Sequence, residues 1–332
     1  MMPTSHCMSV KHQNYTPSQA HTVRGLLGLL GLALLSAACG QPAYEAEARA
    51  KRWGVPAVRI DRDVVYAEYG QYKLMLDVYR PPESVQQAAA PGIVVVRGGK
   101  WQQGDKDGFG YIAGQLAMQG FVAASIEYRT AEEAKFPAAV QDVKAAVRWM
   151  RAHGAAYGVD PDLIGAIGGS AGAHLVAMLG TSAGTFEGEG GNPETSSEVQ
   201  AVVAMGGAYN LRALADSGSP EIVDAVTEFV GAPLHAHARA LVAASPVTYV
   251  SGRSAPLLLM HSRTDPLVSY SYSEEMERAY RRAGAPVALK LIEAPNVHGF
   301  WGNPYYFPEA KHHAVEFFRK HLKSPIRARL RS

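Results

Sequence analysis

Short apolar runs alternate with helical patterns along most of the chain, and this alternation constrains the fold more than any other feature. The run Gly92–Val96 (GIVVV) is continuously apolar, as expected of a strand buried on both faces. From Pro137 to His153, apolar residues recur at helical spacing. Such alternation predicts an α/β domain with a mostly parallel central sheet and helices on both faces. Further strands are predicted at 64–69, 74–79, 121–126, 163–167, 199–205, 257–261 and 287–292, and further helices at 109–119, 173–179, 273–283 and 308–322.

The predicted alternation continues from residue 59 to residue 323 without a linker that would divide it, so one domain is expected there. Residues 209–254 interrupt it as a small helical insertion, and residues 324–332 form a basic tail. Hydrophobic residues make up 47% and charged residues 19% of the 332, which excludes a disordered or coiled-coil chain. The net charge is +2 and no basic stripe stands out, so nucleic acid is not expected as a partner.

An apolar segment near the start, Leu26–Ala38, is too short to span a bilayer, which takes about 20 residues. Arg24 precedes it and small residues end it, as in a secretory signal peptide comprising residues 1–38. Cys39 follows directly, and the string LSAAC resembles the lipobox of bacterial lipoproteins, with Ser36 where Leu is usual. This resemblance implies export and a lipid anchor at Cys39, followed by a linker over residues 39–58. The alternative is a plain signal peptide followed by a chance cysteine.

The segment Gly168–Gly172 (GGSAG) fits the pattern G-x-S-x-G. It follows the predicted strand LIGAI and precedes the predicted helix AHLVAML, which is the context this pattern requires. A serine on such a sharp turn presents its hydroxyl at the edge of the sheet, and the glycines allow strand and helix to approach closely. Ser170 is therefore the candidate nucleophile, although a glycine-rich packing turn would have the same sequence.

The acid and the base are expected after the serine, in that order. Asp265 follows the predicted strand LLLMH, and His298 follows the predicted strand VALKLIEA. Both therefore lie past carboxyl ends of strands, where ligand chemistry is found in parallel sheets. His298 can accept the proton of Ser170, and Asp265 can hold the imidazole and stabilise its charged form.

Other titratable residues are not expected to belong to the triad. His174 lies on the first turn after Ser170 and is expected to be a packed, hydrogen-bonded helix residue. His261 lies near Asp265 and is expected to support it. Asp216 and Asp224 follow no strand and are read as solvated. No metal, nucleotide or flavin motif is found, so no cofactor is implied.

Acyl transfer also needs N–H donors aimed at the tetrahedral oxygen. One is expected from Ala171, directly after the nucleophile, and the second from the loop after GIVVV. That loop begins Arg97-Gly98-Gly99-Lys100-Trp101, where two glycines let the backbone approach a substrate. The alternative is an ordinary glycine turn.

Together these motifs resemble the α/β-hydrolase carboxylesterases of the group related to hormone-sensitive lipase, feruloyl esterases and kynurenine formamidases. The loop RGGKW is similar to their HGG-x-W motif, GGSAGAHL to their serine elbow and HSRTDPLV to their acid loop. The stretch from Glu127 to Asp142 resembles their Y-R…P-A…D pattern. The resemblance covers residues 60 to 322. It implies the α/β-hydrolase fold, Ser170, Asp265 and His298 as the triad, and Gly99, Lys100 and Ala171 as oxyanion donors.

Two residues depart from the family pattern. Arg97 stands where the family has His, and a guanidinium cannot act as a neutral acceptor. Arg97 is expected either to form a structural salt bridge or to contact a carboxylate of the substrate. Ser262 stands where the family usually has Gly, which is expected to matter little.

The leading functional prediction is a serine hydrolase that cleaves small to medium carboxylic esters through an acyl-enzyme. Trp101, Arg97 and Tyr209 are the candidate substrate-binding residues. An amidase or formamidase would use the same triad, and a non-catalytic binding protein could retain the same fold. The sequence does not indicate an oligomeric state or a natural substrate.

Overall fold

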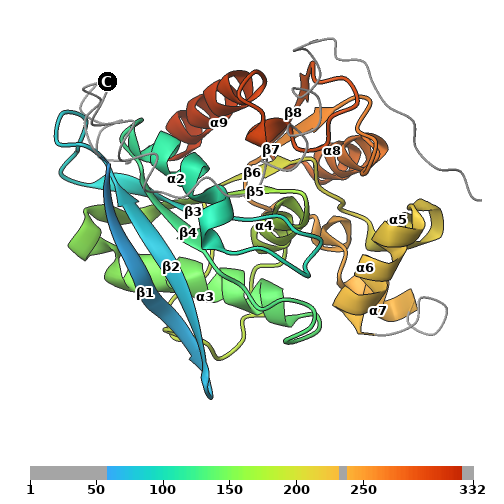
Figure 1. Ribbon diagram of the computed structural model, residues 1–332, viewed down its shortest axis with the longest axis horizontal. Helices are drawn as coiled ribbons and strands as arrows, with labels where there is room; N and C mark the ends of the chain where they lie inside the picture. Colours follow the sequence, from blue (N-terminus) through green and yellow to red (C-terminus); the bar gives the residue numbers. More distant parts are fainter. Residues whose placement is uncertain (1–57, 232–237, 324–332) are drawn as a thin grey trace, which may run out of the picture. The chain divides into compact units, whose positions relative to one another are not determined.

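The computed structural model describes residues 58–231 and 238–323, where the chain forms one eight-stranded sheet flanked by helices (Figure 1). The predicted signal peptide, Cys39 and the basic tail lie outside the described residues. The strands are β1 (Arg59–Tyr69), β2 (Tyr72–Arg80), β3 (Ala90–Val96), β4 (Val122–Ile126), β5 (Val159–Gly169), β6 (Ala201–Met205), β7 (Leu257–Ser262) and β8 (Val287–Ile292).

The strand order is β1-β2-β4-β3-β5-β6-β7-β8. The first two strands form an antiparallel hairpin, which turns at Gly70 with a φ of 62°, and β2 pairs antiparallel with β4. All pairs from β4 to β8 are parallel. This mostly parallel sheet confirms the predicted α/β-hydrolase architecture.

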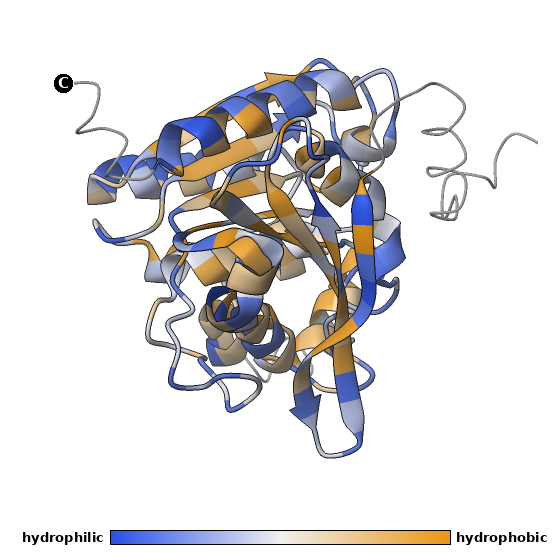
Figure 2. Ribbon diagram, turned by 90° about the vertical axis from the view of Figure 1, so that its left-hand side faces the viewer, coloured by the Kyte–Doolittle hydropathy of each residue, from blue (hydrophilic) through white to orange (hydrophobic). Residues whose placement is uncertain are grey.

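The central strands are apolar because side chains on both of their faces are buried. In β3, Ile93 and Val95 face one core cluster, whereas Val94 and Val96 face the other. All four are fully buried, as expected of a parallel strand covered on both sides. Figure 2 shows the hydrophobic strands inside and hydrophilic stretches along the outer helices. The run GIVVV is therefore explained by its place at the centre of the sheet.

Helices cover both faces of the sheet. One core cluster contains residues of α2 and α9, and the other contains residues of α3, α4 and α8. The arrangement confirms the prediction from helical spacing, and α3 begins within one residue of the predicted start at Pro137. Outside the insertion, the helices of the described residues are α2 (Gly110–Ala117), α3 (Ala138–His153), α4 (Ala171–Thr181), α8 (Ser271–Ala283) and α9 (Phe307–His321), with short 3-10 helices η1 (Lys106–Phe109), η2 (Gly154–Tyr157) and η4 (Phe300–Gly302).

The insertion between β6 and β7 is helical, as predicted. The longest of its described helices, α6 (Pro220–Val230), begins with proline and is followed by Gly231, whose φ of 81° suits a helix C-terminus. Ile222, Val226 and Phe229 bury the inner face of α6 in the core. The insertion also contains α5 (Leu211–Ser217), α7 (Ala238–Ala243) and η3 (Pro246–Tyr249).

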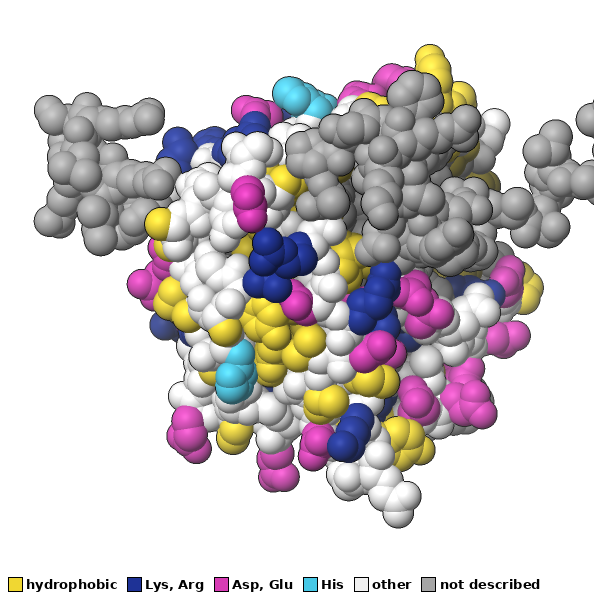
Figure 3. Space-filling view, turned by 60° about the vertical axis from the view of Figure 1, so that its left-hand side comes forward, with side chains coloured by type: hydrophobic (Ala, Val, Ile, Leu, Met, Phe, Trp, Pro, Cys, Tyr) yellow, Lys and Arg dark blue, Asp and Glu magenta, His cyan; other side chains and the backbone are white. Residues whose placement is uncertain are grey.

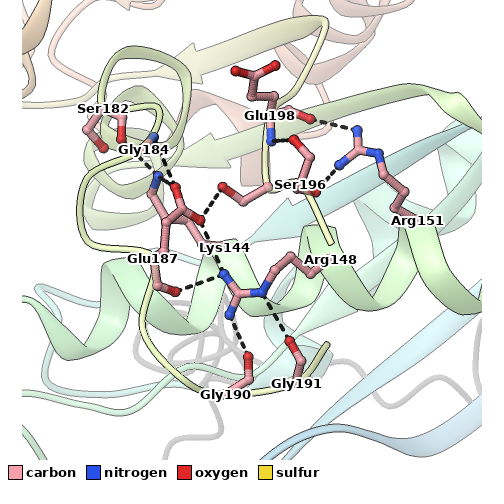
Figure 4. A network of polar contacts seen from close by, with 11 residues as sticks. Lys144, Arg148, Arg151, Ser182, Gly184, Glu187, Gly190, Gly191, Ser196 and Glu198 are labelled. Atoms are coloured by element: carbon pink, nitrogen blue, oxygen red, sulfur yellow. Dashed lines mark hydrogen bonds and ion pairs between the residues drawn. The ribbon is translucent and has the colours of Figure 1, made fainter. Parts of the chain in front are cut away.

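The loop over residues 184–197, which is rich in Gly, Glu and Ser, is held by buried cations of α3 (Figure 4). Arg148 donates to backbone carbonyls of Glu187, Gly190 and Gly191. Lys144 forms an ion pair of 2.8 Å with Glu187. Burial lowers the pKa of Lys144, while hydrogen bonds from Lys144 and Ser197 outweigh partial burial and lower the pKa of Glu187. The loop is thus fixed although it has no regular secondary structure.

The face shown in Figure 3 carries acidic, basic and hydrophobic side chains side by side. On the β1–β2 hairpin, Lys73 and Glu68 form an ion pair of 3.5 Å in which both side chains are exposed. Within the ranges that the structure describes, no helix is both long enough and apolar enough to cross a bilayer.

Candidate active site

Ser170 lies on a sharp turn between β5 and α4. Its φ of 54° and ψ of −121° are unusual for a non-glycine residue, as expected of a nucleophile elbow. A Cβ atom on Gly168 would lie 3.0 Å from the backbone nitrogen of Ala173, and one on Gly172 would lie 2.8 Å from the carbonyl carbon of Val96. Both glycines therefore allow close backbone approach, which is the reason predicted for the motif.

The structure brings Ser170, His298 and Asp265 together from three distant segments. His298 Nε2 lies 2.9 Å from Ser170 Oγ, and His298 Nδ1 lies 2.7 Å from Asp265 Oδ2. The side chain of Asp265 is fully buried, whereas 17% of the His298 side chain is exposed. The base is therefore reachable by a substrate while the acid is shielded from water.

The surroundings of Asp265 favour its charged form. Its Oδ1 accepts hydrogen bonds of 2.9 Å from the backbone N–H groups of Leu267 and Val268. Burial alone would raise the pKa of Asp265, but hydrogen bonds from His261 and His298 outweigh it and bring the pKa below its usual value. An ionised Asp265 makes His298 donate through Nδ1, which leaves Nε2 free to accept the Ser170 proton.

His261 supports the acid as expected. It is fully buried, and its Nε2 lies 3.4 Å from Asp265 Oδ2. Its Nε2 also donates to the carbonyl oxygen of Val268 at 2.9 Å, and its Nδ1 lies 2.7 Å from Ser273 Oγ. These contacts fix the imidazole beside the loop that carries Asp265.

Two residues connect the loops that carry the acid and the base. From the sequence, Ser262 was given little importance and Thr264 was not identified. The Ser262 hydroxyl donates to the carbonyl oxygen of Ala294 at 2.5 Å, and Thr264 Oγ1 accepts from the N–H of Asn296 at 2.9 Å. Both bonds join the segment before Asp265 to the segment before His298. Ser262, which was expected to matter little, therefore joins the two loops, and the hydroxyl groups beside the acid were the available signal in the sequence.

The loop Gly98–Gln103, here called the oxyanion loop, lies against the nucleophile. A Cβ atom on Gly98 would be 3.2 Å from Ser170 Cβ. Within the described residues, the N–H groups of Gly99 and Lys100 have no hydrogen-bond acceptor. Ala171 is the first residue of α4, so its N–H has no partner within the helix. Two segments beside Ser170 thus offer N–H groups that no other described residue uses.

Arg97 is buried, with 4% of its surface exposed, and its guanidinium stacks 4.1 Å from the ring centre of Tyr128. It donates to the carbonyl oxygens of Gly98 and Gln103, at either end of the oxyanion loop. No carboxylate among the described residues lies within ion-pair distance of it. Arg97 therefore has a structural role, which it performs by binding backbone carbonyl groups. This corrects the expected salt bridge and the expectation that Arg97 binds the substrate.

Trp101 and Tyr209 are also packed in the core rather than at an open surface. Only 4% of Trp101 and 1% of Tyr209 is exposed. Trp101 stacks on Phe229 with ring centres 4.8 Å apart. Their burial corrects the expectation that Trp101 and Tyr209 are exposed to bind a substrate. Trp301, which lies 5.3 Å from His298 between ring centres, is the aromatic residue next to the triad.

His174 is the packed helix residue that its position predicts. It is fully buried, accepts a hydrogen bond from Trp101 Nε1 at 3.2 Å and lies 2.7 Å from the carbonyl oxygen of Ala244. Burial lowers its pKa to about 4 from a usual value of 6.5. The bond from Trp101 requires an unprotonated Nδ1 and the bond to Ala244 requires a proton on Nε2, so the pair together fits the neutral imidazole.

This lowered pKa makes stability fall as the solution is acidified. Above pH 6.5 His174 is neutral in both states, whereas between pH 6.5 and 4 only the unfolded chain takes up the proton. Over that range the free energy of unfolding should lose about 3 kcal/mol through this residue. Denaturant unfolding of the wild type and His174→Asn at pH 7.5 and 4.5 checks this. The same pH dependence in both proteins would contradict it.

Comparison with known proteins places these features in context. The model of the BD-FAE family matches residues 76–280. A probable carboxylic ester hydrolase, LipM, from Mycobacterium tuberculosis is 34% identical over 63% of this chain and 48% of its own length. Esterase LipQ of the same organism is 33% identical over 71% of this chain and 56% of its own. The chain thus spans about half the length of these curated relatives.

Solved structures of esterases have the same fold. A truncated carbohydrate esterase from gut microbiota is 27% identical with a TM-score of 0.69, covering 79% of this chain and 96% of that one. A propionate-bound esterase, Est2, from Thermogutta terrifontis is 26% identical with a TM-score of 0.66, covering 80% and 94%. These similarities confirm the α/β-hydrolase fold.

Proposed function

Because the chain belongs to the BD-FAE family, we propose that it is a serine carboxylic-ester hydrolase that acts through an acyl-enzyme. The observation that carries this proposal is the continuous hydrogen-bonded path from Ser170 through His298 to the buried Asp265. Esterase names among its relatives support the same reaction class. A non-catalytic binding protein would have no need for this path.

The geometry indicates how the triad carries out the reaction. Ser170 Oγ attacks the ester carbonyl carbon and gives its proton to His298 Nε2. The oxygen of the tetrahedral intermediate then lies near the N–H of Ala171 and those of Gly99 and Lys100. His298 returns the proton to the leaving alcohol, the acyl group remains on Ser170, and water activated by His298 releases it as a carboxylic acid.

Of the two reactions, we propose ester hydrolysis rather than amide hydrolysis, because no observation favours an amidase. An amine leaving group must be protonated before the intermediate collapses, whereas an alcohol leaves more readily. Purified protein should therefore hydrolyse short p-nitrophenyl esters faster than the matching p-nitroanilides and an N-formyl aromatic amine, measured as kcat/KM. Faster turnover of the formyl amide would replace the esterase by a formamidase, and silence on every substrate would reject both.

We also propose that the protein is exported and anchored by lipid at Cys39. The supporting observations are the apolar run Leu26–Ala38 and the small residues before Cys39. A single acyl chain gives only reversible membrane binding, so a stable anchor needs more than one. Mass spectrometry of membrane-extracted protein should find the mature chain starting at a lipidated Cys39. A mature chain that carries an unmodified cysteine would contradict the anchor.

A further inference from the structure

The oxyanion loop has a conformation that it cannot keep without support. Gly99, Lys100 and Trp101 have successive φ values of 109°, 55° and 61°. Two of these residues are not glycine, and such backbone conformations persist only when surrounding structure holds them. Arg97 holds the two ends of the loop through the carbonyl groups of Gly98 and Gln103. The middle of the loop needs a second support.

That support comes from α6 of the insertion. Lys100 Nζ lies 2.5 Å from Glu221 Oε1, and Gln102 Nε2 lies 2.5 Å from Glu228 Oε2. Between them, the ring of Trp101 stacks on Phe229 with an interplanar angle of 21°. Three consecutive loop residues thus contact one helix.

The spacing of the helix residues suits this arrangement. Glu221 and Glu228 are seven residues apart, which places them on one face two turns apart. Phe229 is fully buried and anchors α6 in the core, while 66% of the Glu221 side chain is exposed. Neither carboxylate buries apolar surface, and each contacts a side chain of the oxyanion loop. Glu228 also forms an ion pair with Lys135, outside the loop, at 3.8 Å.

We propose that Glu221 and Glu228 are positioning residues that hold the oxyanion loop in its donor conformation. They touch neither the triad nor the oxyanion and act through Lys100 and Gln102. The proposal rests on the proposed esterase function. It makes the insertion, rather than the sheet alone, responsible for the alignment of the Gly99 and Lys100 N–H groups. The consequence is an effect on the transition state rather than on substrate binding.

The test compares E221Q/E228Q with the wild type and with D224N. Asp224 is exposed on the same helix and has no hydrogen bond or ion pair within the described part of the chain, so D224N is a charge control. Loss of one complete oxyanion donor costs about 10²–10³ in rate, and a loosened loop should cost about 10-fold. We expect kcat for p-nitrophenyl butyrate to fall about 10-fold in the double variant with KM within about twofold. D224N should match the wild type.

Two further readouts separate positioning from a merely structural role. Phenylboronic acid, which forms a tetrahedral adduct with a serine, should inhibit the double variant about 10-fold more weakly. Backbone hydrogen exchange of residues 98–103 should accelerate in the double variant, while exchange in β3 and the unfolding midpoint stay unchanged. An unchanged or raised kcat, a change in KM alone, or equal exchange in the loop would overturn the proposal.

The hydrogen-exchange measurement also distinguishes this proposal from the function on which it rests. If the wild type hydrolyses no ester, the esterase proposal fails. The loop exchange then still decides whether α6 holds the loop. If the wild type is active and the double variant behaves like D224N in every readout, only the positioning proposal fails.

Discussion

Replacing Ser170 by alanine is expected to lower kcat for ester hydrolysis by on the order of 10⁴–10⁶, because the variant has no hydroxyl to form the acyl-enzyme. The oxyanion donors of Ala171 and the oxyanion loop remain in this variant, so a small rate above the uncatalysed reaction should survive. Steady-state hydrolysis of p-nitrophenyl acetate measures the loss, and the denaturant unfolding midpoint shows whether the fold is retained.

Ser182→Ala is the matched control for this substitution. Ser182 lies just after the other end of α4, where its hydroxyl donates to the carbonyl oxygen of Met178 at 2.6 Å. This variant should keep kcat within about twofold of the wild type, because it removes a hydroxyl from the same helix without touching His298. Comparable losses in both variants would mean that damage to α4, rather than loss of a nucleophile, lowers the rate.

Replacing Asp265 by asparagine is expected to lower kcat by about 10⁴ with a much smaller change in KM. The asparagine amide has the shape of the carboxylate and keeps one oxygen that can accept from the N–H groups of Leu267 and Val268. The loop that carries residue 265 should therefore keep its conformation. The amide cannot stabilise the imidazolium, and its NH₂ group would favour the tautomer of His298 that carries the proton on Nε2. That tautomer cannot accept the proton of Ser170.

Asp216→Asn serves as the control for the loss of one carboxylate. Asp216 forms an exposed ion pair of 3.0 Å with Arg212 in the insertion, and exposed pairs of this kind contribute little to stability. Its substitution should leave kcat unchanged. A loss of less than about 10-fold in Asp265→Asn, measured on p-nitrophenyl acetate, would exclude Asp265 as the orienting acid.

The arrangement of the fold and triad could be predicted because local patterns encode it. The apolar run of β3, the strand–serine–helix order around Ser170 and the positions of Asp265 and His298 after strands are all visible in short stretches. Parallel topology then brings the ends of those strands to one edge of the sheet. The ends of the strands were harder to predict from the sequence. β5 begins at Val159 because that residue pairs with Ala90, although the segment DPD between Val159 and the apolar run is polar.

The supports of the oxyanion loop could not be predicted, because they are contacts between distant residues. Lys100 and Glu221 are 121 positions apart, and nothing in either local sequence indicates their pairing. The burial of Trp101 likewise depends on Phe229, which lies in the insertion. Arg97 was expected to pair with a carboxylate, either within the protein or on the substrate, because a guanidinium carries a fixed charge. Its actual acceptors are carbonyl groups of its own loop and of Tyr128, which only the folded backbone brings together.

Direct detection of the acyl-enzyme tests the central claim most directly. Wild-type protein mixed with p-nitrophenyl acetate and quenched in acid within the first turnovers should release a burst of one p-nitrophenol per molecule. Peptide mass spectrometry of the quenched protein should then find one acetyl group, on Ser170. Turnover without any acetylated Ser170, or an acetyl group carried by a different residue, would contradict the account.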